Sequence, residues 1–244
     1  MRVLKFDLKG KMAHFRPFYT NANSLSYGFP PRSTIAGLLA GIKGLPRDQY
    51  YDEFSPDKAK ISVRLMTPIR RIMYSVNYVR TKKGDWGLKK ILEKGFETYP
   101  MSIQVILPEN GDFLDYRIYF AHEDEKFFQE LVNAISEGGK YFPYLGITEF
   151  LAWIDNLEVV DGNQTKSRVV HSVAPFSIIE KVDFSRTTHL LVDKMVGHFQ
   201  VEGGFRKPYP GATGEYAYNP DAKPIYLREE VPVVAVGKEN IIWL

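Results

Sequence analysis

The order of periodic segments along the first 160 residues constrains the fold more than any other feature of the sequence. Residues 2–9 alternate apolar and polar side chains, which predicts a strand. The same reasoning predicts strands over residues 61–79, 99–107, 113–120 and 150–160. Asn110-Gly111 lies between the third and fourth of these strands, and this dipeptide is typical of a hairpin turn.

Two segments have helical rather than alternating spacing. The first runs from Ile35 to about Gly44, with Ser33 or Thr34 as its expected N-cap. The second covers residues 122–136 and is ended by Gly138-Gly139. The full order is then strand, helix, strand, hairpin, helix, strand. It predicts an α+β chain whose residues 1–160 form a ferredoxin-like (RRM-like) βαββαβ domain.

The sequence changes in character after Asp161. The expected strands are separated by loops rich in glycine and proline, and no convincing helix is found. These strands cover residues 169–181, 189–200, 216–218 and 231–244. We therefore expect residues 161–244 to form a smaller β-rich lobe.

Cysteine is absent from the chain, which excludes disulfides, thiolate-bound zinc and a thiol nucleophile. The five histidines form neither a His-x-His nor a His-Glu-x-x-His pair, so we expect no metal and no other cofactor. The longest apolar runs are too short to span a bilayer, and the first ten residues lack the apolar core of a signal peptide. We expect a cytoplasmic protein that binds neither a membrane nor a small-molecule ligand.

The most informative stretch for function runs from Arg64 to Lys94. It contains nine lysine and arginine residues but only two acidic residues, Asp85 and Glu93. Aromatic side chains lie among the cations. Cations neutralise phosphates, and aromatic faces stack on unpaired bases. Residues 81–85 are expected at the exposed tip of an insertion between two strands. Such a projection suits binding of single-stranded RNA, although a solvated basic hairpin without a ligand has the same composition.

A second stretch, residues 11–32, leads into the first predicted helix. It carries Arg16, Tyr19, Tyr27 and Arg32, and a helix N-terminus favours a phosphate. The alternative is a structural loop whose tyrosines pack on the sheet. A third stretch, residues 203–211, is basic and glycine-rich but contains no phosphate-binding motif, so a loop between strands is favoured over a binding loop.

An enzyme that cleaves RNA without a metal needs a base for the 2′-hydroxyl and an acid for the leaving oxygen. The candidates in this chain are His14, Tyr50, Tyr51 and His122. Each of these side chains also fits an ordinary hydrogen-bonded position. A binding protein and a nuclease therefore both stay open at this point.

Two motifs carry a resemblance to a known family. The first consists of Leu8, Gly10, Ala13, Phe15-Arg16, Thr20, Ser26-Tyr27, Pro30-Pro31, Ser33 and Gly37-Leu38-Leu39. The second is Tyr141-Phe142-Pro143-Tyr144-Leu145-Gly146. In this order and at this separation they resemble the CRISPR-associated "Cas five" family of the RAMP superfamily, a subunit of type I Cascade complexes. The resemblance covers about residues 1–160.

The resemblance implies a ferredoxin-like body with a thumb between its second and third strands, here at about residues 78–98. Members of the family cap one end of the backbone filament and hold the 5′ handle of the guide RNA. One branch also cuts precursor RNA with a tyrosine and an adjacent lysine–histidine pair. This chain has no Lys-His dipeptide, which favours binding over cleavage.

We therefore expect a non-catalytic crRNA-binding subunit of a type I Cascade complex in antiviral defence. Its expected partners are the crRNA 5′ handle and the backbone and large subunits. The residues expected to hold phosphates are Arg16, Arg32, Arg70, Arg71, Arg80, Lys82 and Lys83. Those expected to stack on bases are Tyr27, Tyr74, Tyr78 and Trp86. The alternative is a metal-independent endoribonuclease that processes CRISPR repeat RNA.

Overall fold

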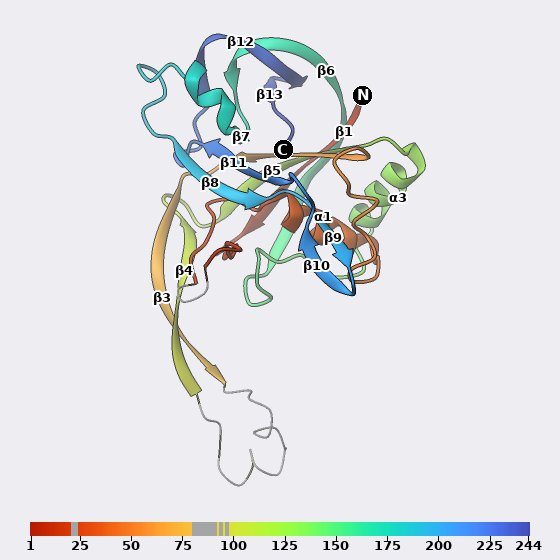
Figure 1. The fold of residues 1–244 in the computed structure, drawn as a ribbon, viewed down its shortest axis with the longest axis vertical. Helices are drawn as coiled ribbons and strands as arrows, with labels where there is room; N and C mark the ends of the chain where they lie inside the picture. The colour runs from red at the N-terminus through yellow and green to blue at the C-terminus, as the bar shows by residue number, and fades with distance from the viewer. Residues whose placement is uncertain (21–23, 80–91, 93–94, 96–97) are drawn as a thin grey trace.

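Strict alternation along β1 (Arg2–Gly10) places Leu4, Phe6 and Leu8 on one face, and these side chains are fully buried in the main core. The computed structural model describes residues 1–20, 24–79, 92, 95 and 98–244 (Figure 1). Its largest element is an antiparallel sheet in the order β13-β12-β6-β1-β5-β2. The other strands of this sheet are β2 (Ala59–Leu65), β5 (Leu114–His122), β6 (Ala152–Val170), β12 (Ile225–Val236) and β13 (Glu239–Ile241).

Two helices contribute to the same core as the apolar face of β1. Helix α1 (Arg32–Lys43) lies between β1 and β2 in the chain, and α3 (Glu125–Ser136) lies between β5 and β6. Their buried residues, such as Leu39 and Phe128, share this core, and each such side chain contributes about 1.5–3 kcal/mol when fully buried. The central strands therefore run β6-β1-β5-β2 in space, with a helix in each crossover, and the fold is a strand-rich α+β arrangement.

The ends of the helices differ from the prediction in one respect. Asp124 is the N-cap of α3, and its carboxylate accepts the Lys126 and Phe127 N–H groups at 2.8 and 3.1 Å. The expected Ser33 or Thr34 cap of α1 is wrong, because that helix begins at Arg32 and Pro31 takes the cap position without a side-chain bond. Ser33 instead donates its Oγ hydrogen to the Val196 carbonyl at 3.0 Å.

The long strand predicted over residues 61–79 is in fact two strands in different sheets. Strand β2 ends at Leu65, and β3 (Ile69–Val79) pairs only with β4 (Thr98–Pro108) in a two-stranded ribbon. The predicted hairpin through Asn110-Gly111 is wrong for the same reason, since β4 and β5 belong to separate sheets. Gly111 does make a turn, with φ +84°, but the turn connects the ribbon to the main sheet. Figure 1 shows the ribbon extending away from the body.

The chain after residue 161 adds strands to the main sheet as well as smaller units. Strand β6 runs unbroken through residue 160, the predicted domain boundary, and β12 and β13 continue its sheet. A three-stranded sheet contains β7 (Ala174–Pro175), β11 (Thr213–Tyr218) and β8 (Leu191–Val196), and a hairpin contains β9 (Phe199–Glu202) and β10 (Phe205–Pro208). The strand predicted to continue to Lys181 is wrong, because residues 176–181 form a 3₁₀ helix after Pro175.

The two edges of the six-stranded sheet approach each other. The Leu244 N–H, just after β13, donates to the Ile61 carbonyl of β2 at 2.9 Å. Arg64 of β2 also forms an ion pair with Glu239 of β13. The sheet is therefore strongly curved. The contacts between its two edges also cover the edge of β2, which would otherwise be open.

The face of β1 away from the core carries buried charges. Asp7 is 2% exposed and receives two hydrogen bonds from Arg117, at 2.7 and 3.0 Å. Burial alone would raise the pKa of Asp7, but the bonds from Arg117 and Asn156 outweigh it and lower that pKa. Among the described helices, none is long and apolar enough to cross a membrane.

Candidate nucleic-acid interface

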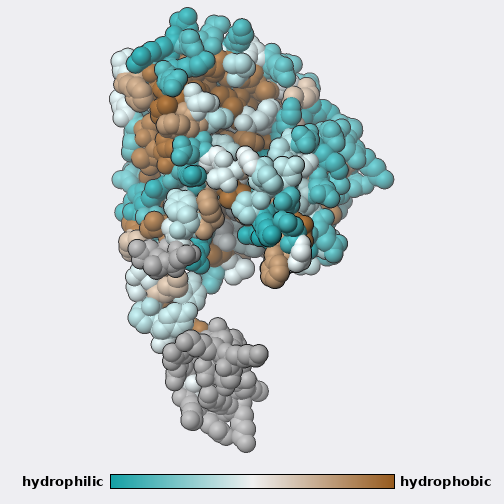
Figure 2. Space-filling model, viewed as in Figure 1, coloured by the Kyte–Doolittle hydropathy of each residue, from teal (hydrophilic) through white to brown (hydrophobic). Residues whose placement is uncertain are grey.

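The β3–β4 ribbon displays aromatic side chains on an exposed surface. Successive residues of a strand point to opposite faces, so Arg70, Tyr74 and Tyr78 share one face of β3. Tyr74 is 54% exposed, and Tyr78 pairs with Tyr99 of β4 with ring centres 6.4 Å apart. In Figure 2 the described part of the ribbon is pale, as expected of tyrosine-rich surface with intermediate hydropathy. The structure thus brings together three of the predicted residues.

Arg71 points the other way, toward the body of the protein. Its guanidinium donates to Asp193 Oδ2 at 3.1 Å and also to the Tyr218 hydroxyl. The prediction that Arg71 holds a phosphate does not fit this position, since its donors are engaged with β8 and β11. Strand alternation separates it from its neighbour Arg70 in the sequence.

Two predicted contacts from the loop before α1 are buried. Arg32 is 2% exposed and donates to the carbonyls of Gly197, Phe54 and Ala59 at 3.2, 3.0 and 2.7 Å. Tyr27 is also buried and donates to the Lys194 carbonyl at 2.8 Å. The prediction that Arg32 holds a phosphate does not fit this position, because its donors hold the start of α1 against neighbouring segments. Tyr27 also lines a cavity of about 350 Å³ beside the start of α1, so its stacking on a base stays a prediction.

Arg80, Lys82, Lys83 and Trp86 lie outside the described residues, as does most of the expected insertion at 78–98.

Arg16 lies where the sequence placed it, beside the N-terminus of α1. It is exposed, and its Nη2 donates to the Thr20 carbonyl at 3.1 Å. Together with Phe18, Thr34, Phe199 and Arg206 it lines a cavity of about 350 Å³. The site therefore combines two cations with three aromatic rings, those of Phe18, Tyr27 and Phe199, at the start of a helix.

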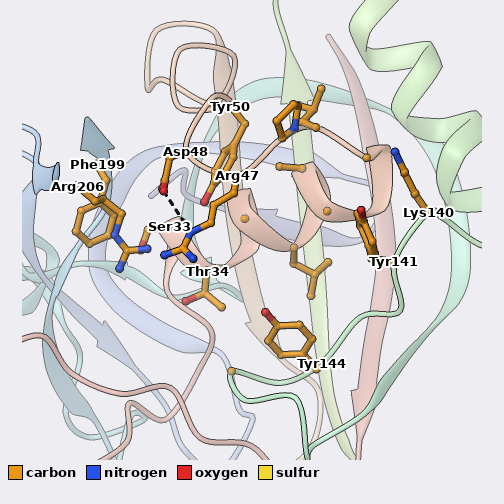
Figure 3. A pocket seen from close by; sticks show the side chains of 18 residues that line it. Ser33, Thr34, Arg47, Asp48, Tyr50, Lys140, Tyr141, Tyr144, Phe199 and Arg206 are labelled. Atoms are coloured by element: carbon orange, nitrogen blue, oxygen red, sulfur yellow. Dashed lines mark ion pairs between the residues drawn. The ribbon is translucent and has the colours of Figure 1, made fainter. Parts of the chain in front are cut away.

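A larger cleft of about 850 Å³ adjoins this cavity and shares four of its lining residues, Ser33, Thr34, Phe199 and Arg206. Its other side chains include Arg47, Tyr50, Lys140, Tyr141 and Tyr144. Figure 3 shows Phe199 and Arg206 on one side of the cleft, Lys140 and Tyr141 on the other, and the first turn of α1 between them. We call the two cavities together the α1 groove.

The second motif of the sequence, residues 141–146, builds one wall of the α1 groove. Leu145 is fully buried, and its carbonyl accepts the His14 N–H at 3.0 Å. Gly146 has φ +92°, and a Cβ there would lie 1.9 Å from the His14 carbonyl oxygen. Only glycine fits this close approach. The anchored loop holds Tyr141 and Tyr144 exposed on the groove.

Small residues of α1 form the floor of the larger cleft. A Cβ on Gly37 would lie 3.0 Å from the Tyr50 hydroxyl oxygen, so this glycine lets Tyr50 lie against the helix. Gly41 has no heavy atom within 4 Å of its would-be Cβ and is open to the cleft. Of these two glycines, only Gly37 is in close contact with a neighbouring side chain.

The acid–base candidates are dispersed. Among them, only Tyr50 lines the α1 groove, and burial raises its pKa, so its hydroxyl is protonated at neutral pH. His14 is buried, with Nδ1 2.8 Å from the Gln104 carbonyl and Nε2 3.0 Å from Ser24 Oγ, and burial lowers its pKa. His122 Nε2 lies 2.9 Å from the Glu53 carbonyl, and its Nδ1 accepts the Asp124 N–H at 3.0 Å. Tyr51 donates to Asp48 Oδ1 at 2.6 Å.

Sequence reasoning missed Arg47, Lys140, Phe199 and Arg206, which come from three distant parts of the chain. Their convergence depends on tertiary structure. The glycine-rich stretch at 203–211 was the available signal for Arg206. In the described part of the chain, no group of three or more acidic or histidine side chains is placed to hold a metal ion.

Comparison with solved structures shows which proteins share this fold. A chain of a "CRISPR RNA-guided surveillance complex" superposes with a TM-score of 0.52 at 15% identity, covering 96% of this chain and 91% of the other. A CRISPR protein from Archaeoglobus fulgidus superposes with a TM-score of 0.58 at 12% identity, covering 100% and 99%. At such identities the likeness shows a common fold alone.

Sequence comparison identifies the family. No curated protein sequence matches the chain. The family described as CRISPR-associated protein (Cas_Cas5) matches residues 3–207, a range that includes both motifs and every wall of the α1 groove. Because this match spans most of the 244 residues, the chain belongs to the CRISPR-associated protein (Cas_Cas5) family.

Proposed function

We propose that the chain is a non-catalytic subunit of a type I CRISPR Cascade complex that binds crRNA at its 5′ handle. The observation that carries this proposal is the α1 groove, whose lining includes aromatic rings and four cations, Arg16, Arg47, Lys140 and Arg206, against one acidic residue, Asp48, which pairs with Arg47. Guanidinium and ammonium groups neutralise phosphates, and exposed rings stack on unpaired bases. A groove of this composition suits a single strand of RNA.

The fold is compatible with this role. The spatial order β6-β1-β5-β2, with a helix in each crossover, supports the proposal that this part of the chain follows the ferredoxin-like βαββαβ plan. In the proposal, the β3–β4 ribbon is the stem of the expected thumb. Tyr74 and Tyr78 on the ribbon then stack on bases, while the body caps the backbone of the complex beside its large subunit.

A second candidate function is favoured by one observation. Tyr50, Lys140 and Tyr141 share the larger cleft, and a tyrosine with a lysine can serve metal-independent cleavage of RNA. Against this candidate, the raised pKa of Tyr50 makes its hydroxyl a poor base at neutral pH. Both nitrogens of His14 and of His122 are held by hydrogen bonds. The binding subunit is therefore the preferred proposal.

The test uses the purified full chain, labelled CRISPR repeat RNA and EDTA. Retention of intact RNA supports the binding subunit. A discrete cleavage product that is lost in Tyr50→Phe or Lys140→Ala, or in His14→Ala or His122→Ala, supports the nuclease instead. RNA that is neither retained nor cleaved contradicts both candidates.

A further inference from the structure

The β9–β10 hairpin stands where the two cavities of the α1 groove meet. Phe199 and Arg206 line both cavities. In the hairpin register Phe199 lies opposite Pro208 and Val201 lies opposite Arg206, so all four side chains share one face. The Arg206 guanidinium carbon lies 4.4 Å from the centre of the Phe199 ring. The ring thus supports the guanidinium at the junction of the cavities.

The base of the hairpin is tied to the start of α1. Arg32 donates to the Gly197 carbonyl at 3.2 Å, and Ser33 donates to the Val196 carbonyl at 3.0 Å. The backbone closes the base with Gly197 N–H to the Ala212 carbonyl at 2.7 Å and Tyr209 N–H to the His198 carbonyl at 3.0 Å. Buried Arg32 therefore has an indirect role, since it fixes the position from which Arg206 projects.

The opposite face of the hairpin differs in its electrostatics. Lys207, the next residue after Arg206, forms an ion pair with Glu202 at 3.2 Å and lines neither cavity. Phe205 is 74% exposed on that face. The two neighbouring cations are consequently separated, with Arg206 toward the groove and Lys207 away from it.

The sizes of the cavities indicate how a strand would divide between them. The smaller cavity, at about 350 Å³, is near the lower end of the range of ligand pockets, roughly 300–1,000 Å³, and suits a single nucleotide. The larger cleft, at about 850 Å³, suits a short run of nucleotides. A rigid duplex does not fit two adjoining cavities that share the Phe199 and Arg206 face of a hairpin, whereas a flexible single strand does.

We infer that the β9–β10 hairpin divides the RNA path into two subsites, and that Arg206, oriented by Phe199, binds the phosphate at which the strand passes from one to the other. A guanidinium supported by an aromatic ring presents its in-plane N–H donors to phosphate oxygens in a restricted geometry. This inference rests on the proposed RNA-binding function and adds to it a subsite boundary and the residue that marks it.

The experiment compares Arg206→Gln with Lys207→Gln, because the two variants lose the same charge at adjacent exposed positions. The probe is a fluorescein-labelled single-stranded RNA of about ten nucleotides, and binding is followed by anisotropy across a salt series. We expect Arg206→Gln to weaken binding about tenfold and to reduce the salt slope by about 0.7, the value of one phosphate contact on a single strand. Lys207→Gln should stay within about twofold of the native chain.

A third variant separates the effect of the positive charge from that of the planar guanidinium group. Arg206→Lys keeps the charge, so it should keep the salt slope but lose part of the affinity, because an ammonium has no planar fork to stack on Phe199. Unchanged melting temperatures show that the variants fold. If Arg206→Gln and Lys207→Gln weaken binding equally, or if neither does while the native chain binds RNA, the inference is overturned and the proposed function stands. A native chain that binds no RNA overturns both.

Discussion

The Nη2 nitrogen of Arg71, on β3, lies 3.1 Å from Asp193 Oδ2 on β8. The same carboxylate oxygen accepts the Tyr218 hydroxyl at 3.0 Å and the Gly28 N–H at 3.2 Å. One carboxylate therefore connects the root of the ribbon, the three-stranded sheet and the loop before α1. It lies in a partly shielded position, with the Asp193 side chain 13% exposed.

This relationship predicts different outcomes for two neighbouring arginines. Arg71→Ala leaves Asp193 without its cation, so we expect a loss of about 1–3 kcal/mol in unfolding free energy and faster amide exchange at the root of β3. Arg70→Ala removes an exposed cation on the other face, so stability should change by less than about 0.5 kcal/mol while RNA binding weakens. Urea unfolding and hydrogen exchange measure the first effect, and anisotropy the second. Equal stability losses would contradict the assignment of Arg71 to the body.

The exposed tyrosine on the ribbon gives a second prediction. If Tyr74 stacks on a base, Tyr74→Ala should weaken binding of single-stranded RNA by about 1–3 kcal/mol, because that is the usual contribution of one stacked base. Met73→Ala is the matched control, since Met73 is equally exposed, at 55% against 54%, but lies on the opposite face of β3. Equal losses in the two variants would show that the tyrosine face has no particular role in binding.

Alternation predicted the core of the sheet correctly because local periodicity decides which face of a strand is buried. Residues 2–9 bury one face through their alternation. The helix that ends at Ser136 buries one face in the same way through its spacing of three and four residues. Alternation does not reveal which strand pairs with which. Alternation therefore predicts neither the break between β2 and β3 nor the separation of β4 from β5.

The same limit applies to the candidate site. Composition located Arg16, Arg70 and Tyr74 on the surface, where the structure also places them. It misplaced Arg32 because a buried arginine bonded to three carbonyls has the same sequence neighbourhood as an exposed one. Arg206 and Lys140 become neighbours of one cleft only through contacts between segments far apart in the chain. Single-sequence patterns carry no information on such contacts.

A third prediction concerns the pH dependence of stability. Burial, with repulsion from Asp7, raises the pKa of Asp115 to about 6, above its ordinary value of 3.8. Between these two values the folded state binds a proton that the unfolded state does not, so Asp115 makes the protein more stable as pH falls from 7 toward 4. At about 1.36 kcal/mol per pKa unit, the effect is of the order of 1–3 kcal/mol.

Asp115→Asn tests this directly, because asparagine has the same shape and no charge to bury. We expect the variant to be more stable than the native chain at pH 7 and to lose most of the pH dependence between pH 7 and 4. Asp155→Asn is the control, since Asp155 lies in the same charge cluster but hydrogen bonding to Lys9 lowers its pKa. Thermal melting at several pH values gives the comparison. An Asp115→Asn variant that is less stable at pH 7 would mean that the ionised carboxylate, 3.8 Å from Lys9, is favourable overall.

The last prediction concerns the loop that carries Tyr141 and Tyr144. Gly146 combines φ +92° with an approach to the His14 carbonyl that leaves no room for a Cβ. Gly146→Ala therefore adds a steric conflict with backbone to the strain of a left-handed conformation. Gly111 is the control position for backbone strain alone, because it has φ +84° and no heavy atom within 4 Å of its would-be Cβ. We expect Gly111→Ala to cost about 1–2 kcal/mol, the usual cost of left-handed backbone, and Gly146→Ala to cost about 3 kcal/mol or more.

The two variants should also differ in RNA binding. To relieve the conflict, the backbone at residue 146 must move away from His14, which breaks the bond from the His14 N–H to Leu145 and displaces the aromatic wall of the α1 groove. Under conditions where both variants remain folded, Gly146→Ala should bind single-stranded RNA several-fold more weakly, while Gly111→Ala, far from the groove-lining residues in sequence and in neither cavity, should bind like the native chain. Normal RNA affinity in a folded but destabilised Gly146→Ala chain would show that the position of this wall does not matter for binding, and would shift the RNA contacts toward the side of the groove formed by Arg16 and Arg206.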